Sequence, residues 1–297
     1  MSRSLPSILP PQRVDALMPE NNTDDKFRLQ LRFWGVRGSI PATGARFSEF
    51  GGNTACLEIR LPTGEVIVFD CGSGLRHLGK LLAQEKPQGG RDIPIFLTHF
   101  HWDHIQGIPF FQPLFDPRNR ATVYSMREDA PQRLSVAISR PYFPLDFDQL
   151  GAPKQLVQAG SDPVECFGAT VQPFPMNHPQ GAIGYRIEHQ GASIVYASDL
   201  EHGDAHLDQV LVDSARGADV LIYDAQYTPE EYETKRGWGH STWREAARVA
   251  REAGVKRLVL IHHDPEHEDA EIHRIVDQAR AEFECTEGAK EGLTIRL

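Results

Sequence analysis

Residues 98–104 read Thr-His-Phe-His-Trp-Asp-His and directly follow the apolar run IPIFL. A short apolar run that stops at a polar segment predicts a buried strand ending at that point. His99 and His101 are two residues apart, so on an extended chain their side chains point to the same side. Asp103 and His104 follow where a short helix begins, and they can reach a second point nearby. Imidazole and carboxylate groups in this order suit Zn, Mn or Fe.

The charge balance limits the partners of the chain. The sequence has 297 residues, with 31 Lys and Arg against 41 Asp and Glu and a formal net charge of −10. Proteins that grip long nucleic acid present a basic face, so we expect no long nucleic-acid partner and no binding to an anionic membrane. The four cysteines form no CxxC pair, which favours reduced thiols in a cytosolic protein.

Residues 1–26 are rich in Pro, Ser, Asn and Asp, and they predict an extended or disordered arm. They contain no continuous apolar core of a signal peptide, and the whole sequence contains no stretch of ~20 apolar residues. We therefore expect a cytoplasmic protein with a folded domain at 27–297.

The folded part shows two successive groups of strands, each followed by helices. Strands are predicted at FRLQLRFWGV, TACLEIRL, GEVIVFDC and IPIFLTHF, with a helix at LRHLGKLLAQ. The middle, 121–175, reads as short strands and loops. A hairpin follows at AIGYRIEH and ASIVYASD, then strands at DVLIYDA, RLVLIH and GLTIRL, with helices at STWREAARVAREAG and EDAEIHRIVDQARAEF. This order predicts two sheets packed face to face with helices outside, a four-layered αββα sandwich in the α/β class.

The segment 98–104 resembles the HxHxDH signature of the metallo-β-lactamase superfamily at every position, and the resemblance runs from about Phe33 to the C-terminus. Members of that superfamily complete their metal sites with a later His, a bridging Asp and a final His. These match His178 in MNHP, Asp199 in YASD and His262 in LIHH.

The resemblance implies a hydrolase with two divalent ions, zinc being expected first and manganese or iron also being accepted. One ion is expected on His99, His101 and His178. The other is expected on Asp103, His104 and His262, and Asp199 is shared between them. Paired ions give a bridging hydroxide at neutral pH and neutralise charge on the attacked oxygen. Asp103 is therefore assigned to catalysis as well as to metal binding.

Two further residues are expected to support the ligands. Asp70, in FDCG, matches a carboxylate that hydrogen-bonds the metal-site histidines of family members, although an Asp there could also simply cap a turn. His263, next to His262, is expected to contact a metal ligand rather than the metal.

Two more segments resemble the phosphodiesterase branch of the superfamily, which includes ribonuclease Z and bacterial cyclic-nucleotide phosphodiesterases. They are His240-Ser241-Thr242 before a helix and Asp224-Ala225-Gln226-Tyr227 after a strand. In that branch a carboxylate holds the histidine, which protonates the leaving alkoxide. The resemblance thus implies Asp224 holding His240 as general acid, with Asp where ribonuclease Z typically has Glu. General-acid help is worth ~10²–10⁴-fold.

The substrate expected from these features is a small phosphodiester, with a cyclic nucleotide as its leading member. Ribonuclease Z grips tRNA with a long Gly/Pro-rich arm and a basic surface, and neither is evident in this sequence. Arg236 and Trp238, in KRGWG, and Arg37 could contact a phosphate and a base, or could be solvated cations and a core Trp.

Three alternatives stay open at this point. A ribonuclease Z-like enzyme would process the 3′ end of tRNA, and a lactone or carboxyl-ester hydrolase would use the metals without the pair of Asp224 and His240. A non-catalytic binding domain could retain the metals as structural elements. The apolar segment IPFFQPLF could line a homodimer interface or could belong to the core.

Overall fold

The computed structural model describes residues 27–297 apart from 86 and 88, so the expected arm at 1–26 lies outside the described residues. The first of two sheets contains both ends of the described chain. From edge to edge its strands are β14 (Thr294–Arg296), β1 (Gln30–Gly35), β2 (Cys56–Arg60), β3 (Val66–Phe69), β4 (Asp92–Phe96), β5 (Arg120–Ser125) and β6 (Lys154–Gln158).

The second sheet is built from the later part of the chain. Its strands, in spatial order, are β13 (Thr286–Gly288), β12 (Leu258–Ile261), β11 (Val220–Asp224), β10 (Ala192–Ala197), β9 (Ala182–His189), β8 (Ala169–Met176) and β7 (Val164–Cys166). The expected hairpin is present, with β9 antiparallel to β10.

Each sheet has an antiparallel part and a parallel part. The pairs from β3 to β6 and from β10 to β13 are parallel. Parallel strands end at the same edge of their sheet, and ligands in α/β folds are held just beyond such carboxyl ends. The loops after β3, β4, β10, β11 and β12 are therefore the places to look for functional side chains.

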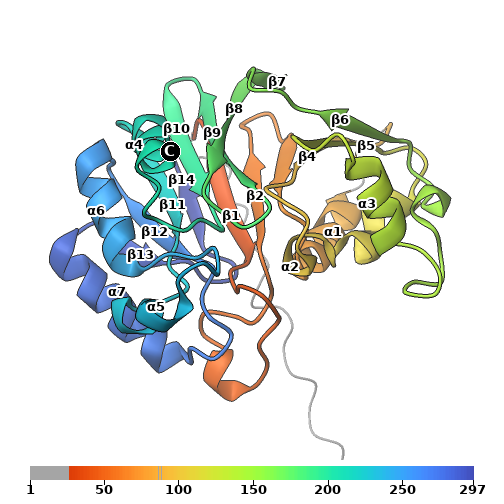
Figure 1. Ribbon diagram of the computed structural model, residues 1–297. Coiled ribbons are helices and arrows are strands. Elements are labelled where there is room, and N and C mark those ends of the chain that lie inside the picture. Colours follow the sequence, from red (N-terminus) through yellow and green to blue (C-terminus); the bar gives the residue numbers. More distant parts are fainter. Residues whose placement is uncertain (1–26, 86, 88) are drawn as a thin grey trace, which may run out of the picture.

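Helices cover the outer faces of both sheets (Figure 1). On the first sheet lie α1 (Leu75–Glu85), α2 (Trp102–Ile105), α3 (Ala130–Ala137) and the 3-10 turns η3 (Ile108–Phe110), η4 (Gln112–Phe115) and η5 (Phe147–Gln149). The second half of the chain supplies α4 (Ala205–Ala215), α5 (Pro229–Lys235), α6 (Trp243–Ala253) and α7 (Asp269–Glu282). The remaining 3-10 turn is η2 (Ala45–Phe47).

The buried apolar side chains of the described residues form three clusters. One lies between the sheets and includes Phe33, Phe69, Tyr196 and Ile222. The other two lie between each sheet and its own helices. Two sheets with a shared core and helices outside form the predicted four-layered αββα sandwich, and the fold prediction is confirmed.

Local signals explain where the helices begin. Thr242 caps α6 by accepting a hydrogen bond from the backbone N–H of Glu245, and Gly254 ends that helix in a left-handed conformation. Thr228 and Glu231 form a capping box at α5, a helix that was not predicted from the sequence.

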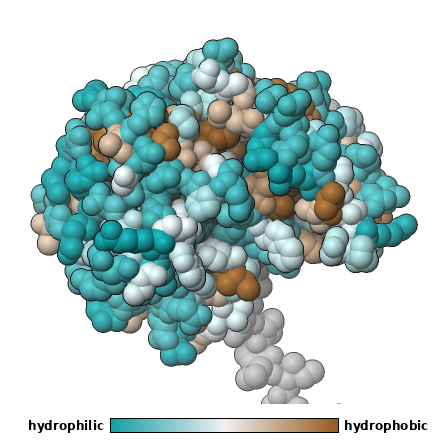
Figure 2. Space-filling model, viewed as in Figure 1, coloured by the Kyte–Doolittle hydropathy of each residue, from teal (hydrophilic) through white to brown (hydrophobic). Residues whose placement is uncertain are grey.

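No helix in the described part of the chain is long and apolar enough to cross a membrane. Figure 2 shows a largely hydrophilic surface on this face, with small hydrophobic patches.

Candidate metal centre

Strand ends bring the candidate ligands together at one edge of the sandwich. Asp199 follows β10 and His262 follows β12, and Asp70 lies directly after β3. All three have a positive φ, of 65°, 63° and 57° respectively. A non-glycine residue in this left-handed region costs about 1–3 kcal/mol and is found mainly where surrounding contacts hold it for function.

Three histidines form the first group of possible ligands. His99, His101 and His178 each offer a ring nitrogen, and these atoms lie within 4.8 Å of one another. His178 Nε2 is 3.4 Å from His101 Nδ1. Since His178 follows β8 and the other two follow β4, this group joins the two sheets.

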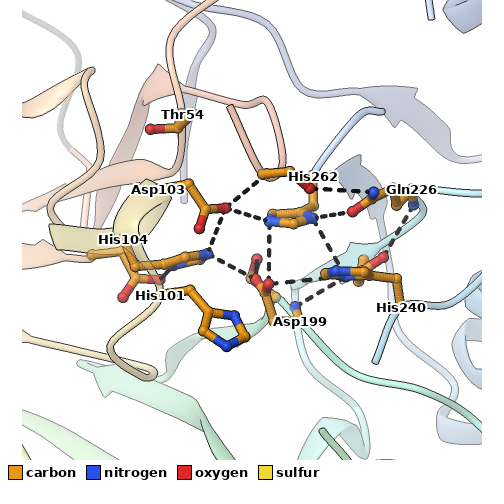
Figure 3. Close-up of polar contacts among 12 residues, drawn as sticks. Thr54, His101, Asp103, His104, Asp199, Gln226, His240 and His262 are labelled. Carbon is orange, nitrogen blue, oxygen red and sulfur yellow. Dashed lines mark hydrogen bonds and ion pairs between the residues drawn. The ribbon is translucent and has the colours of Figure 1, made fainter. Parts of the chain in front are cut away.

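A second group lies beside the first and contains Asp103, His104, Asp199 and His262, again with ligand atoms within 4.8 Å. The Nε2 atoms of His104 and His262 lie 3.1 and 3.2 Å from the carboxylate of Asp199. His99 Nε2 of the first group is 3.8 Å from the same carboxylate. Figure 3 shows Asp199 between the side chains of His104 and His262. Asp199 can therefore reach both groups.

The residues present fit bound cations. The Nε2 atoms of His99 and His104 are buried and make no hydrogen bond of suitable geometry within the described chain. A buried polar atom without a partner costs free energy, which coordination to a metal removes. The donor set is imidazole and carboxylate, which suits divalent transition metals. The two groups could hold one ion each, with Asp199 between them.

The neighbouring charges favour cation binding. Burial lowers the pKa of His99 and of His178, which keeps both rings neutral, as metal ligands must be. Burial also disfavours charge on His104 and His262, but the carboxylates around them outweigh it. They raise the pKa of His104 well above its usual value and that of His262 to about 9. Without metal, protons on these two rings neutralise the carboxylates.

Asp70 fixes the orientation of His104. His104 Nδ1 is 2.8 Å from Asp70 Oδ2, which also accepts a hydrogen bond from the hydroxyl of Tyr196 at 3.0 Å. Asp70 Oδ1 accepts from the backbone N–H of Thr98 at 2.9 Å. With Nδ1 bonded to a carboxylate, Nε2 of His104 is the atom left to bind metal. The structure thus places Asp70 in contact with His104, a candidate metal ligand.

Gln226 has the same role at His262 but was not identified from the sequence as a contact of a ligand. Gln226 Oε1 accepts from His262 Nδ1 at 2.9 Å, which leaves Nε2 facing the site. Another candidate ligand, Asp103, is also held by a hydrogen bond, since its Oδ2 accepts from the backbone N–H of Ser39 at 2.8 Å. The only signal for Gln226 was its position two residues after Asp224, since a side-chain amide carries no pattern of its own.

A histidine and a carboxylate adjoin the second group. His240 Nδ1 lies 2.9 Å from Asp224 Oδ2, and the centre of its ring is 4.8 Å from that of His262 and 5.6 Å from that of His178. Figure 3 shows His240 near His262. Asp224 is fully buried and also accepts from the backbone N–H groups of Asp199 and Gln226. The carboxylate is therefore fixed, and it orients the imidazole.

The family follows from comparison with known proteins. A family model described as the Beta-lactamase superfamily domain matches residues 65–263, about two thirds of the chain. The chain belongs to the metallo-β-lactamase superfamily.

Three relatives extend this result. Ribonuclease BN of Cronobacter sakazakii is 26% identical and aligns with 91% of this chain and 100% of its own length. Ribonuclease Z of Methanothermobacter thermautotrophicus is also 26% identical, covering 91% and 97%. The metallo-β-lactamase fold protein YhfI of Bacillus subtilis superposes with a TM-score of 0.69 at 20% identity, over 92% of this chain and 100% of its own. This chain is thus a metal-dependent hydrolase of the metallo-β-lactamase superfamily, and its relatives include ribonucleases BN and Z.

Arg37 does not lie at the rim of this metallo-β-lactamase site, and the predicted position is wrong. Its side chain is 0% exposed, and its guanidinium donates to the carbonyl oxygens of Gly51, Asp264 and His267. Burial of a cation is costly unless acceptors surround it. Here the three carbonyls accept from Nε and Nη1, and the carboxylate of Asp269 lies 3.9 Å from Nη2. Arg37 braces loops behind the site and cannot contact a substrate.

His263 also differs from its expected role. Its Nε2 lies 2.9 Å from the carbonyl oxygen of Ala289, and its ring packs edge-on against Phe50. Burial and the nearby charge of Arg37 lower its pKa to about 3. His262 and His263 are consecutive, and their side chains make separate sets of contacts. His263 packs in the core, and no hydrogen bond among the described residues joins its ring to a candidate ligand.

A pocket of about 440 Å³ opens at the site and is lined by Ser39, Phe100, His101, Trp102, Asp103, Asp199 and His240. Trp102 is 78% exposed and Trp238 62% exposed, so neither belongs to the core. Arg236 is exposed and forms an ion pair with Glu233.

Another pocket, of about 430 Å³, lies at the β9–β10 turn, at the opposite end of β10 from Asp199.

Proposed function

We propose that this protein is a dinuclear-metal phosphodiesterase that hydrolyses a small phosphodiester, with a cyclic nucleotide as the first candidate. The proposed cofactors are two divalent ions, zinc being the first choice. The proposed ligands are His99, His101 and His178 for one ion and Asp103, His104 and His262 for the other, with Asp199 shared. When bound, such ions lower the pKa of a water between them and neutralise charge on a phosphoryl oxygen.

The contact between His240 and Asp224 is the observation that carries this proposal. A phosphodiester expels an alkoxide, which is strongly basic and needs a proton as it leaves. Asp224 Oδ2 holds Nδ1 of His240 at 2.9 Å, so Nε2 is the ring atom that can deliver a proton. The ring also packs against that of His262, one of the proposed ligands. A proton donor packed against a proposed metal ligand suits a reaction with a poor leaving group.

Pocket size and charge support a small substrate. A volume of about 440 Å³ is in the range that holds a small organic molecule. The lining includes Phe100 and Trp102, which offer aromatic surface for a nucleobase. The alignment with ribonuclease BN is 323 positions long, whereas this whole chain has 297 residues, of which 91% are aligned. Some aligned positions of ribonuclease BN therefore have no counterpart here, so that relative has segments that this chain lacks. The net charge of −10 also disfavours a large polyanion.

Precursor tRNA is the second candidate substrate, because the curated relatives that align over nearly their whole length are named as ribonucleases. Both candidates use the same metals and the same proton donor. They differ in the size and charge of what must bind outside the pocket.

A substrate panel tests the proposal. Metal-free protein is loaded with Zn²⁺ or Mn²⁺ and assayed on bis(p-nitrophenyl) phosphate, 3′,5′-cyclic nucleotides, cyclic dinucleotides, lactones and a 3′-extended tRNA precursor. Turnover of at least one cyclic nucleotide is the expected result. Cleavage of the tRNA precursor alone would replace the first candidate with the second. Hydrolysis of lactones alone would overturn the phosphodiesterase assignment.

A further inference from the structure

Glu201 lies two residues after Asp199 and is outside the residue set proposed for metal binding and proton transfer. Its side chain is 9% exposed and accepts three hydrogen bonds. Oε1 accepts from the hydroxyl of Tyr232 at 2.8 Å and from the backbone N–H of Gly237 at 2.7 Å, and Oε2 accepts from the backbone N–H of Gly239 at 2.9 Å. One carboxylate therefore fixes the segment that leads into His240.

Gly239 links that carboxylate to a candidate metal ligand. Its N–H is bound by Glu201, while its carbonyl oxygen accepts from Nδ1 of His178 at 2.8 Å. That hydrogen bond leaves Nε2 of His178 as the atom directed at the three-histidine group. The next residue is His240, so one glycine sets the position of both a ligand and the proton donor.

The backbone of Glu201 holds His178 from its other side. The N–H of Glu201 donates to the carbonyl oxygen of Asn177 at 2.7 Å, and Nδ2 of Asn177 donates to the carbonyl oxygen of Glu201 at 2.8 Å. Asn177 directly precedes His178. The main chain and the side chain of Glu201 thus fix the two segments between which the ring of His178 is held.

We propose that Glu201 is a positioning residue that holds Gly239 so that His178 and His240 face the reaction together. The part of this inference that concerns His240 rests on the proposed phosphodiesterase function, whereas the part that concerns His178 does not. Without the carboxylate, the loop at 237–239 loses its anchor, and both imidazoles lose a fixed orientation.

Glu201→Gln is the direct test, since Gln has nearly the same shape but only one accepting oxygen. Its NH₂ group must face either the N–H of Gly239 or the donors on Oε1, so at least one contact is lost. Tyr232→Phe is the matched control. It removes one donor to the same carboxylate and leaves both glycine contacts in place.

A pair of glycine variants tests the same inference without changing Glu201. Gly239→Ala would place a Cβ 2.4 Å from Nδ1 of His178, whereas a Cβ at Gly237 meets nothing within 4 Å. Both positions have positive φ, of 87° and 84°, so Ala is strained at each to a similar extent. Any additional effect of Gly239→Ala comes from the clash with the segment of His178, because the added Cβ would also lie 2.4 Å from Cδ of Pro179, the next residue.

The measurements are Zn²⁺ affinity of the metal-free protein, by competition with a chelator, and kcat of the loaded protein on two substrates. We expect Glu201→Gln and Gly239→Ala to lower the affinity of one Zn²⁺ site by about 10–100-fold relative to Tyr232→Phe and Gly237→Ala. We also expect kcat to fall about tenfold or more on a cyclic nucleotide, and less on bis(p-nitrophenyl) phosphate, whose leaving group needs no proton.

Zn²⁺ affinity and a substrate ratio equal to wild type in Glu201→Gln would overturn the inference. Equal losses in all four variants would also overturn it, because a general brace of the fold would produce that result. If no phosphodiester is hydrolysed by any form, the proposed function fails, and the Zn²⁺ affinities still decide whether Glu201 positions His178.

Discussion

Replacement of Asp70 by asparagine tests how strongly the buried contacts of the site support metal binding. Asp70 is 0% exposed and has φ 57°, a conformation that asparagine adopts as readily as aspartate. The change therefore leaves shape and backbone preference nearly intact. It removes one accepting oxygen from a carboxylate that faces Thr98, Tyr196 and His104.

The expected magnitude follows from those contacts. The NH₂ group that Asp70→Asn introduces must face either the N–H of Thr98 or the donors of Tyr196 and His104, and each buried donor left without a partner costs about 1–3 kcal/mol. Loss of the charged acceptor for His104 adds to this cost. We expect the free energy of unfolding to fall by about 2–4 kcal/mol, which lowers Tm by roughly 5–10 °C. Zn²⁺ affinity should fall about 10–100-fold.

Calorimetry of the metal-free variant gives the change in Tm, and chelator competition gives the change in Zn²⁺ affinity. Asp92→Asn is the matched control, because Asp92 pairs with Arg120 on the surface, where both side chains are more than half exposed. An exposed pair contributes little, so neither quantity should change appreciably. Wild-type Zn²⁺ affinity in Asp70→Asn would refute the idea that Asp70 orients His104 for metal.

Three further predictions concern the reaction and the metals. His240→Ala should lower kcat on a cyclic nucleotide by ~10²–10⁴-fold, but by less than about tenfold on bis(p-nitrophenyl) phosphate, in steady-state assays of the loaded enzyme. Zn²⁺ binding near pH 7 should release protons, because the pKa of His104 lies well above its usual value and that of His262 is about 9 without metal. Affinity should therefore rise with pH up to about 9, as calorimetry in two buffers would measure. Trp102→Ala should raise KM for a nucleotide about fivefold or more with little change in kcat, as loss of a stacking surface worth ~1 kcal/mol predicts.

Each of these has a clear contrary outcome. Equal losses on both substrates in His240→Ala would mean that His240 supports the site instead of donating a proton. Zn²⁺ binding without proton release would mean that the two imidazoles are already neutral in the metal-free protein. A fall in kcat with unchanged KM in Trp102→Ala would remove the stacking role.

The sequence predicted the layers, and the family resemblance singled out candidate ligands that the structure brings together beyond strand ends. A strand such as β12 has a strong apolar pattern, and the polar residue that follows it is visible without any knowledge of packing. The helices α3, α4 and α5 were not predicted. Helices α3 and α5 are short, with 8 and 7 residues, and α3 and α4 have weakly separated polar and apolar faces.

Contacts between distant loops could not be read from the chain. Gln226, Ser39 and Glu201 are single polar residues whose partners lie far away in sequence, so no spacing indicates them. The prediction for Arg37 was wrong for the opposite reason, because its neighbouring residues gave a signal that was misleading. A cation between glycines suggests an exposed turn, but the loop of Gly51 and the loop that contains Asp264 and His267 close around its guanidinium. Only the folded structure decides which way such a side chain faces.

The parallel order of the strands also separates two rims of the molecule. The proposed ligands and the proton donor lie beyond the carboxyl ends of strands, whereas the β9–β10 turn at His189–Gly191 lies at the other end of the sandwich. An affinity handle or a surface linker grafted into that turn would project away from the pocket. The enzyme could then be immobilised in a single orientation with its entrance open to the solution.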